Sequence, residues 1–392
     1  MNQAVKTVPF YRHSMGCQAD IDAVAKVLTG TFLTSAGTGR AVEAELCAFF
    51  GVARAKLTNS WTNGAVAALL AMDIGQGDEV IVPAMTFIAS SNVVEMVGAK
   101  PVFVDVEPGT LLIDIDRVAE AVTPRTRAVI PVHLYGQMVD IAALRARIGE
   151  DIAILEDCAH CFEGRLNGHR PGAFSNAAIF SFYATKNVTC GEGGAVISSD
   201  EAFMDKLQQT MLHGMSAGAD RRFEGQLYRH WDMERLGTKA NLPDILAALL
   251  PRQIAEVDQK LAIRQGLVDR YRSAFAGHNL IAMVDEVEGC VSAQHLFVIG
   301  VPAEIRDMVL KALNQAGVGC TVNYRAVHGL EFYRTKYGFG RDDFPIAADW
   351  GERTLSLPLF PGLTADEQDY VIECVLSAVA DAAKEAGLAG QD

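Results

Sequence analysis

Residues 78–105 read DEVIVPAMTFIASSNVVEMVGAKPVFVD, and this stretch sets the fold class. Its pattern predicts a strand over 78–83, a helix over 89–97 and a second strand over 101–105. Apolar runs predict further strands over 127–133, 152–157, 177–183 and 194–198. Strands that alternate with helices form β-α-β units, so we expect an α/β protein with a mostly parallel sheet covered on both faces. Ligands of such sheets bind at the carboxyl ends of the strands, where we look for a site.

The pattern changes near residue 240. Helical spacing runs from Pro243 to Ala276, with a kink expected at Pro251. Beyond it, the sequence predicts strands over 294–301 and 319–323 and helices over 305–316 and 365–383. We therefore predict a large domain over residues 1–250 and a smaller α+β domain over 251–392, with the N-terminal segment able to pack on the smaller domain.

Composition narrows the range of partners. The 392 residues include 34 basic and 48 acidic side chains, a formal net charge of −14. A general nucleic-acid binder needs a basic surface, so that class is excluded, although a local basic pocket is not. The sequence has no apolar stretch long enough for a membrane helix and no apolar leader at its start, which predicts a cytoplasmic protein without a membrane contact. We therefore expect its eight cysteines to be reduced.

A zinc site is one interpretation of the cluster formed by Cys158, His160 and Cys161. A closed tetrahedral site needs four ligands, and no second pair with ligand spacing follows in the sequence. We therefore expect no metal and interpret the two cysteines as packing residues.

Lys186 is the strongest candidate for chemistry. It follows the predicted strand 177–183 and precedes the glycine-rich segment Gly191–Gly194. A lysine in a half-buried place has a lowered pKa, and its neutral amine can form a Schiff base with a carbonyl. The alternative is an ordinary surface lysine beside a turn.

Asp157 ends the predicted strand 152–157, and His160 follows three residues later. A carboxylate in this place can hold a proton on a buried heteroaromatic nitrogen, which makes that ring an electron sink. His160 could orient the same ring. The alternatives are that Asp157 caps the next turn and that His160 is a satisfied core histidine.

A third feature is the polar segment Asn59–Gly64, which precedes a helical pattern over residues 65–72. The start of a helix attracts anions, and hydroxyls of Ser60 or Thr62 could complete a phosphate cradle. The alternative is plain N-capping, and no Walker or dinucleotide-binding pattern is present. Together the lysine, the aspartate and the helix start match the aldehyde, the ring nitrogen and the phosphate of pyridoxal 5′-phosphate.

From about Pro9 to its C-terminal helix, the chain resembles the DegT/DnrJ/StrS family of sugar aminotransferases. The matching blocks are residues 77–87, 98–106, 123–136, 156–160 and 181–194. Within that family, segments 237–245 and 355–361 most resemble the enzyme that makes UDP-4-amino-4-deoxy-L-arabinose. The resemblance implies the aspartate-aminotransferase fold, type I. It has a large domain with a mostly parallel seven-stranded sheet and a smaller α+β C-terminal domain.

The resemblance also implies roles for individual residues. Lys186 matches the Schiff-base lysine, Asp157 the partner of the pyridine nitrogen, and His160 a residue beside the cofactor ring. Phosphate ligands are implied at Thr62, Asn63 and Ser181, and contacts with the two ring faces at Phe87 and Ala159; Ser60 remains a candidate phosphate ligand from its place at the helix start. Lys239 and Asn241 match a segment that reaches the phosphate of the neighbouring subunit, which implies a homodimer with shared active sites.

The sequence departs from the family at two positions. Trp61 stands where a small residue is usual, so its indole either reshapes the substrate entrance or packs into the dimer interface. Asn323 stands where the arabinose enzyme has histidine, which leaves the sugar open. Candidate substrate contacts, with local packing as the alternative, are Trp61, Arg12, Tyr135, Tyr324, Arg325 and His328. Basic candidates for a diphosphate are Arg325, Lys239 and Arg12.

The expected reaction moves an amino group from glutamate to a 3-keto or 4-keto group of a nucleotide-linked hexose or pentose. Lys186 would act as general base and acid. A family dehydratase is disfavoured, because Lys186 is present where such relatives replace it. A cyclitol or other non-nucleotide ketone remains an alternative substrate, and a cofactor-bound sensor without turnover is an alternative of another class.

Overall fold

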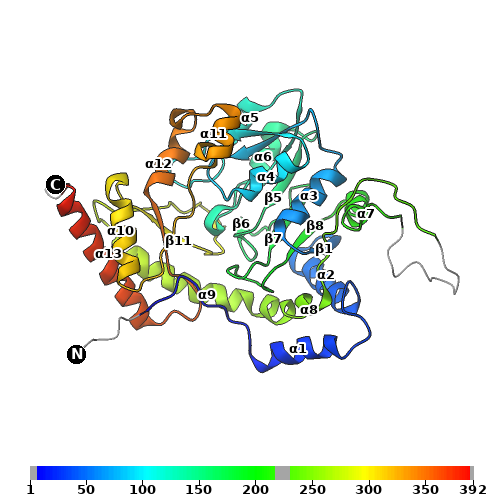
Figure 1. Ribbon diagram of the computed structural model, residues 1–392, viewed down its shortest axis with the longest axis horizontal. Helices are drawn as coiled ribbons and strands as arrows, with labels where there is room; N and C mark the ends of the chain where they lie inside the picture. The colour runs from blue at the N-terminus through cyan, green and yellow to red at the C-terminus, as the bar shows by residue number, and fades with distance from the viewer. Residues whose placement is uncertain (1–6, 217–229, 389–392) are drawn as a thin grey trace.

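The computed structural model describes residues 7–216 and 230–388. Over these residues the central element is a seven-stranded sheet with the strand order β1-β8-β7-β5-β4-β2-β3 (Figure 1). Its strands are β1 (Arg54–Thr58), β2 (Glu79–Pro83), β3 (Lys100–Val104), β4 (Thr126–Val129), β5 (Ala153–Asp157), β7 (Ala177–Ser181) and β8 (Gly194–Ser198). Strand β8 runs antiparallel to β1 and β7, whereas the pairs from β7 to β3 are parallel. The predicted α/β class and mostly parallel sheet are confirmed.

Helices cover both faces of this sheet because its central strands are apolar on both sides. Along β7, Ala177 and Ile179 belong to one buried cluster, and Ala178 and Phe180 belong to another. Alternate residues of a strand point to opposite faces, so the two clusters lie on opposite sides of the sheet. The first contains residues of α3 (Trp61–Ala71), α4 (Ala89–Met96) and α7 (Glu201–Thr210). The second contains residues of α2 (Gly37–Phe50), α8 (Asp244–Ala247) and α9 (Leu250–Phe275).

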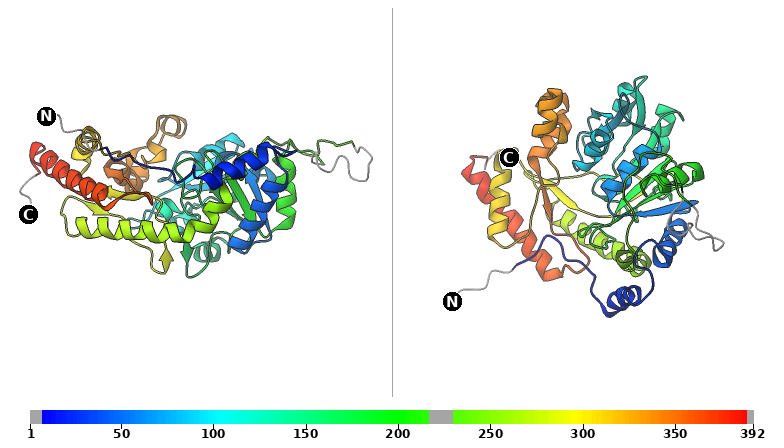
Figure 2. Two further views of the ribbon diagram at one scale, coloured as in Figure 1. Left: turned by 90° about the horizontal axis from the view of Figure 1, so that it is seen from below. Right: turned by 45° about the vertical axis from the view of Figure 1, so that its right-hand side comes forward.

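A smaller α+β part lies beside this layer structure. Its antiparallel sheet has the order β12-β11-β9, formed by β9 (Ala282–Met283), β11 (Phe297–Gly300) and β12 (Thr354–Leu357). Helices α10 (Ala303–Gln315) and α13 (Ala365–Glu385) pack against each other there. The long helix α9 contacts α2 at one end and α13 at the other, and so it joins the two parts (Figure 2).

The N-terminal segment lies on the smaller part. The Val8 N–H donates to the carbonyl of Gly317, and the Val8 side chain belongs to the apolar cluster of this part. Gly319 lies against the same segment, where an added Cβ would come within 2.3 Å of the Phe10 nitrogen. The domain boundary at residue 250 stays a prediction.

The remaining elements are peripheral. They are α1 (Gln18–Leu28), α5 (Ile115–Ala121), α6 (Ile141–Ile148), α11 (Glu331–Tyr337), α12 (Pro345–Arg353) and the short pair β6 (Arg165–Leu166) and β10 (Cys290–Val291). Within the described ranges, no helix combines the length and the apolar character that crossing a bilayer requires.

Three expected elements differ in the structure. The expected strand over 319–323 is wrong, because the segment makes only an isolated bridge, between Thr321 and Ser356. The strand expected over 127–133 ends at Val129. The expected helix over 243–276 is two helices, α8 and α9, because Pro251 occupies the first turn of α9, where a proline is tolerated.

Candidate active site

A cavity of about 430 Å³ opens at the carboxyl ends of the parallel strands. Asp157 ends β5, Ser181 ends β7, and Thr86 follows β2 by three residues; all three line the cavity. The residues from the sequence analysis that line it are Ser60, Trp61, Thr62, Phe87, Asp157, Ala159, His160, Ser181, Lys186 and Tyr324. We call this cavity the main pocket.

One end of the main pocket is the start of α3. Ser60 is the N-cap of this helix, and its Oγ accepts a hydrogen bond from the Asn63 N–H at 3.1 Å. The N–H groups of Trp61 and Thr62, in the first turn, have no partner within the helix. Together with the hydroxyls of Thr62 and Ser181, they form a site suited to a phosphate. The N-cap interpretation is thus confirmed for Ser60, and the phosphate cradle stays a prediction that this cap does not exclude.

Asn63 lies beside this site without lining it. Its side chain donates to Asn59 Oδ1 at 2.9 Å, so its amide is already engaged. Gly194 allows the close approach of β8 below the same turn, because an added Cβ would lie 2.9 Å from the Ser60 carbonyl carbon and 2.6 Å from the Phe180 oxygen.

Asp157 is buried and its carboxylate is held on both oxygens. Oδ2 accepts from the Ser90 hydroxyl at 2.8 Å, and Oδ1 accepts from the Ala159 N–H at 3.1 Å. Burial raises the pKa of Asp157, while the Ala159 N–H, the Ser90 hydroxyl and the charge of Lys186 act in the opposite direction. A buried carboxylate with this surrounding is suited to pair with a protonated ring nitrogen.

Lys186 lies in the loop between β7 and β8, half-buried in the wall of the main pocket. Its backbone N–H donates to the Tyr183 carbonyl at 2.9 Å, and its carbonyl accepts from the Tyr11 hydroxyl at 3.3 Å. Burial lowers the pKa of its amine from 10.5 to about 8, with the negative charge of Asp157 opposing the shift. A substantial neutral fraction near neutral pH makes this amine a nucleophile and a proton carrier.

His160 is a buried, neutral histidine in the same wall. Its Nδ1 accepts the Tyr135 backbone N–H at 3.2 Å, and its Nε2 lies 3.0 Å from the Tyr324 hydroxyl. Burial, with help from Lys186 and His295, lowers the pKa of His160 well below its ordinary value. Tyr135 itself lies behind His160, with its hydroxyl donating to the Asn323 carbonyl at 2.6 Å. The Phe87 ring packs against the Tyr324 ring at a centroid distance of 5.6 Å.

Four expected substrate contacts do not line the main pocket, namely Tyr135, which lies behind His160, and Arg12, Arg325 and His328. Arg12 forms an ion pair with Glu367 at 3.1 Å and lines a different cavity. Arg325 and His328 line a third cavity, of about 240 Å³, together with Arg334 and Arg341. Their expected contact with substrate stays a prediction that a single chain does not support.

Lys239 and Asn241 also lie outside the main pocket of their own chain. They flank Ala240, whose carbonyl accepts the Asn59 N–H at 2.7 Å, and Asn241 donates to Ser35 Oγ at 2.6 Å. Their expected contact with the phosphate of a neighbouring subunit stays a prediction.

Trp61 is buried within the subunit, with 5% of its surface exposed. Its indole N–H donates to the Ile179 carbonyl of β7 at 3.1 Å. The ring is therefore a fixed wall of the main pocket near the phosphate site, and it packs inside the subunit rather than on an exposed face that a partner could cover.

Sequence reasoning missed several residues of the main pocket. Ser90 and Thr86 form a chain to Asp157, in which the two hydroxyls lie 3.0 Å apart. Thr86 lies in the turn before α4 and Ser90 lies in the first turn of that helix, so helical spacing did not indicate this pair. Also missed were Thr185 and Glu192, whereas Asn323, which the sequence analysis connected with the identity of the sugar, lines the pocket.

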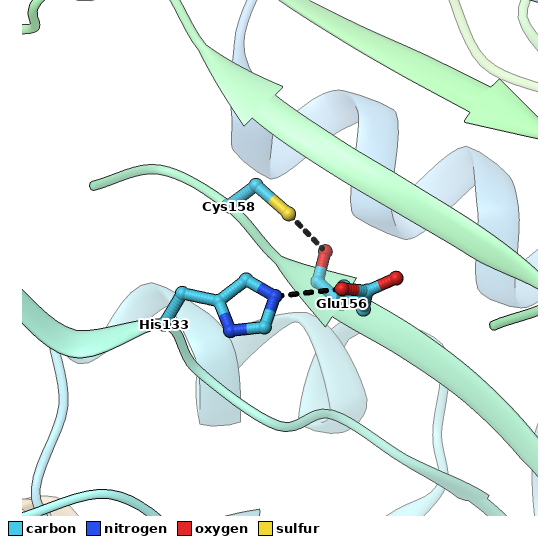
Figure 3. Close-up of side chains that lie close together, drawn as sticks. All are labelled: His133, Glu156 and Cys158. Carbon is cyan, nitrogen blue, oxygen red and sulfur yellow. Dashed lines mark hydrogen bonds and ion pairs between the residues drawn. The ribbon is translucent and has the colours of Figure 1, made fainter. Parts of the chain in front are cut away.

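A group of side chains with metal-ligand spacing lies below β5. Within residues 7–216 and 230–388, it consists of His133, Glu156 and Cys158 (Figure 3). Nδ1 of His133 accepts the Val139 N–H at 3.0 Å, so its Nε2 carries the proton and donates to Glu156 at 2.7 Å. The other oxygen of Glu156 accepts from Gly172 and Ser175. Both ring nitrogens of His133 and both carboxylate oxygens of Glu156 thus have partners within the protein, and the group supports the strand that ends at Asp157. In the expected zinc alternative, both nitrogens of His160 are likewise engaged.

Comparison with known proteins gives one consistent result. The model of the DegT/DnrJ/EryC1/StrS aminotransferase family matches residues 16–376. One similar solved structure is Spr1654 of Streptococcus pneumoniae in its PLP form, which is described as a sugar aminotransferase. It is 29% identical to this chain, and the TM-score is 0.88. The match covers 96% of this chain and 100% of that chain. Its PMP form gives a TM-score of 0.89 with the same identity and coverage. DesV of S. venezuelae, solved with a ketimine intermediate, is 32% identical, with a TM-score of 0.82 over 92% of this chain and 94% of that chain.

Proposed function

The chain belongs to the DegT/DnrJ/EryC1/StrS aminotransferase family and is a pyridoxal-phosphate-dependent transaminase, and from this premise we propose that it moves an amino group from glutamate to the keto group of a nucleotide-linked sugar. The observation behind the proposal is the main pocket. It gathers Lys186, Asp157 and the start of α3 in one cavity of about 430 Å³.

The residues present fit pyridoxal 5′-phosphate. The N–H groups and hydroxyls at the start of α3 suit its phosphate, the buried Asp157 carboxylate suits its ring nitrogen, and the Lys186 amine suits its aldehyde. Phe87 and Ala159 line the walls that would face its ring. When bound, the cofactor supplies an aldehyde that bonds to amines and a pyridinium ring that takes up electrons.

The chain's own residues then have separate tasks. Lys186, with a pKa of about 8, accepts a proton from the amino donor and later returns one, as a general base and acid. Asp157 holds a proton at the ring nitrogen, because its carboxylate is fixed by Ser90 and Ala159. His160 is neutral, and its hydrogen bonds fix its ring in the pocket wall. A ping-pong sequence follows, with the donor and the ketone bound in turn.

The sugar substrate rests on similarity. Spr1654 is described as a sugar aminotransferase, and it shares the whole length of this fold. Asn323 lines the main pocket, and the enzyme that makes UDP-4-amino-4-deoxy-L-arabinose has histidine at this position. Our candidate substrates therefore include both hexoses and pentoses with a 3-keto or 4-keto group. A diphosphate needs cations, and Lys239 of a second subunit is our candidate within a homodimer with shared sites.

One observation favours a second candidate, a cyclitol or another ketone without a nucleotide. Arg12 and Arg325 lie outside the main pocket. Among the described residues of one chain, Lys186 is the only basic side chain of its lining apart from His160. A neutral ketone would not need further cations there.

In the deciding experiment, the holoenzyme first reacts with glutamate, which loads the cofactor with an amino group. A panel of nucleotide keto-sugars and free cyclitol ketones is then added. Loss of the pyridoxamine absorption band with one nucleotide keto-sugar supports the proposal. Consumption only by free ketones supports the second candidate, and the absence of any half-reaction with glutamate contradicts the choice of donor.

Subunit mixing tests the shared site. Lys186→Ala and Asn241→Ala subunits are mixed, and exchange between two-fold dimers should restore about a quarter of the wild-type sites. The control mixture pairs Lys186→Ala with Asp157→Asn, two changes in the pocket of the same subunit. Each site of that mixed dimer carries one change, so no activity should be restored. With subunit exchange verified separately, a failure of the Lys186→Ala and Asn241→Ala mixture to gain activity over the control mixture contradicts a role for Asn241 across subunits.

A further inference from the structure

A second buried histidine lies directly behind His160. The ring centroids of His160 and His295 are 4.5 Å apart, with their planes at 36°. His295 is 6% exposed, and no part of the mechanism above uses it. It is linked to the residue that follows Lys186, because its Nδ1 lies 3.1 Å from Asn187 Oδ1.

The orientation of the Asn187 amide is fixed by its other two partners. Its Nδ2 lies 3.0 Å from Glu163 Oε1 and 2.9 Å from the Ala293 carbonyl. Both partners are oxygen acceptors, so the atom between them must be the amide nitrogen, and the oxygen must face His295. An oxygen that faces Nδ1 requires a proton there, so His295 is the tautomer with Nδ1–H.

Glu163 is held in turn by Arg264 of α9. Both side chains are buried, with 0% and 2% exposure, and Arg264 Nη2 forms an ion pair with the same oxygen that accepts from Asn187. Arg264 Nε also donates to the Ala293 carbonyl at 3.3 Å. The ion pair and the hydrogen bond hold this carboxylate oxygen in place, and so it fixes its neighbours.

The two neighbouring imidazoles therefore have opposite tautomers. His160 accepts the Tyr135 N–H at Nδ1, so its proton is on Nε2 and is donated to the Tyr324 hydroxyl at 3.0 Å. His295 carries its proton on Nδ1. Burial, together with the nearby charges of Lys186 and Arg264, lowers the pKa of His295 well below its ordinary value, so both rings are neutral.

We propose that Asn187 is a positioning residue, which transmits the fixed geometry of the buried Arg264–Glu163 pair to the tautomer of His295, the ring that packs against His160 beside Lys186. The groups facing His295 are His160, Lys186 and Arg264, with Glu163 acting through Asn187. The inference rests on the transaminase chemistry of Lys186 and not on the identity of the ketone, so a different substrate leaves it intact.

The direct test is the tautomer of His295 in the cofactor-free protein, read from the ring nitrogen NMR signals of ¹⁵N-histidine-labelled protein. Signals are assigned with His295→Gln and His160→Gln. A neutral Nδ1–H form for His295 and a neutral Nε2–H form for His160 are expected in the unaltered chain. The reverse tautomer at His295, or a doubly protonated His295 ring at neutral pH, overturns the proposal. This result is read from the unaltered chain, so it does not depend on the folding of a variant.

The matched variant is Asn187→Asp, which keeps the shape but cannot donate to Glu163 or Ala293 without taking up a proton. The added charge should place a second proton on His295, and the changed charge distribution beside Lys186 should shift the pH midpoint of the absorption band of the cofactor bound to that lysine. The rate constant kcat should fall roughly tenfold or more, with the KM for the donor within about threefold, as expected for a misplaced proton carrier.

Two further variants separate positioning from folding. Asn314→Asp adds the same charge on the exposed side of α10 and should leave tautomer, midpoint and kcat unchanged. Glu163→Gln retains an oxygen that can accept from Asn187, so His295 should keep its tautomer in that variant. A folded Asn187→Asp protein with an unaltered midpoint and unaltered histidine signals contradicts the proposal.

Discussion

The Ser90 hydroxyl donates a hydrogen bond of 2.8 Å to Asp157 Oδ2. This bond joins the start of α4 to the end of β5, which are 67 residues apart in the chain. The second oxygen of Asp157 is fixed by the Ala159 N–H, so the direction of the carboxylate is set by the fold itself. A group that must meet one ring nitrogen benefits from such preorganisation, because no reorientation accompanies binding.

Replacement of Ser90 by alanine should weaken cofactor binding. The change removes a hydrogen bond to a buried carboxylate, which stabilises by about 1.5–3 kcal/mol and corresponds to roughly 10- to 100-fold in affinity. The control is Ser91→Ala, since the Ser91 hydroxyl is also buried but donates to the Ile88 carbonyl at 3.0 Å. Equal cofactor dissociation constants for the two variants, measured by fluorescence titration, would contradict the role of Ser90.

Replacement of Lys186 by alanine should abolish turnover while leaving noncovalent cofactor binding at the α3 site. Loss of a general acid–base group costs roughly 10²- to 10⁴-fold, and loss of the covalent link adds to this. Lys206→Ala is the control, because Lys206 pairs with Asp73 on the surface and should not affect turnover. Near-normal activity of Lys186→Ala in a steady-state assay would contradict the role of Lys186 as the general base and acid.

Replacement of Asp157 by asparagine should lower both cofactor retention and rate. An amide cannot stabilise a proton on the ring nitrogen, and the loss of such a charge partner in a water-excluded site costs about a hundredfold or more. The control is Asp258→Asn, whose carboxylate is half exposed and pairs with Arg165. If the single-turnover rate of Asp157→Asn equals that of the control, another group protonates the ring.

The amine of Lys186 should titrate far below an ordinary lysine. Burial lowers its pKa from 10.5 to about 8, so in the cofactor-free protein its acylation rate should reach half-maximum near pH 8. Asp157 opposes this shift, so the midpoint should fall further in Asp157→Asn.

The same shift has a consequence for stability, with a defined sign. The unfolded chain binds this proton more tightly than the folded chain, so the charged lysine lowers the free energy of unfolding of the cofactor-free protein below about pH 8. This loss of stability becomes smaller as the pH rises from about 8 to 10.5. Lys186→Met should therefore raise the Tm more at pH 7 than at pH 10. An equal effect at both values would contradict a lowered pKa.

Trp61 should contribute to stability through its packing more than through its indole N–H. Trp61→Ala opens a cavity beside α3, and changes of this kind cost about 3–5 kcal/mol. Trp61→Phe keeps much of the volume and loses the bond to the Ile179 carbonyl, at a cost of about 1 kcal/mol from that bond. Denaturant unfolding of the two variants tests this order, and an equal loss in both would assign the effect to the hydrogen bond.

The sequence by itself determined the α/β class and the residues at the ends of the strands. The alternation of residues 78–105 is a local signal, and Asp157, Ser181 and Lys186 follow apolar runs that form strands or their loops. Such features depend on neighbours in the chain, so they can be read without the fold. The edge strand β1 escaped notice, because its five residues alternate between charged and apolar ones and resemble a surface segment.

Only the tertiary structure decided which of those residues meet and what holds them. Ser90 reaches Asp157 across 67 residues, and Asn187 reaches His295 across 108 residues. The tertiary structure also places Arg12, Arg325 and His328 outside the main pocket, although the sequence predicted them as substrate contacts. Hydrogen bonds, burial and the resulting pKa values depend on distances between segments, and no pattern along the chain contains those distances.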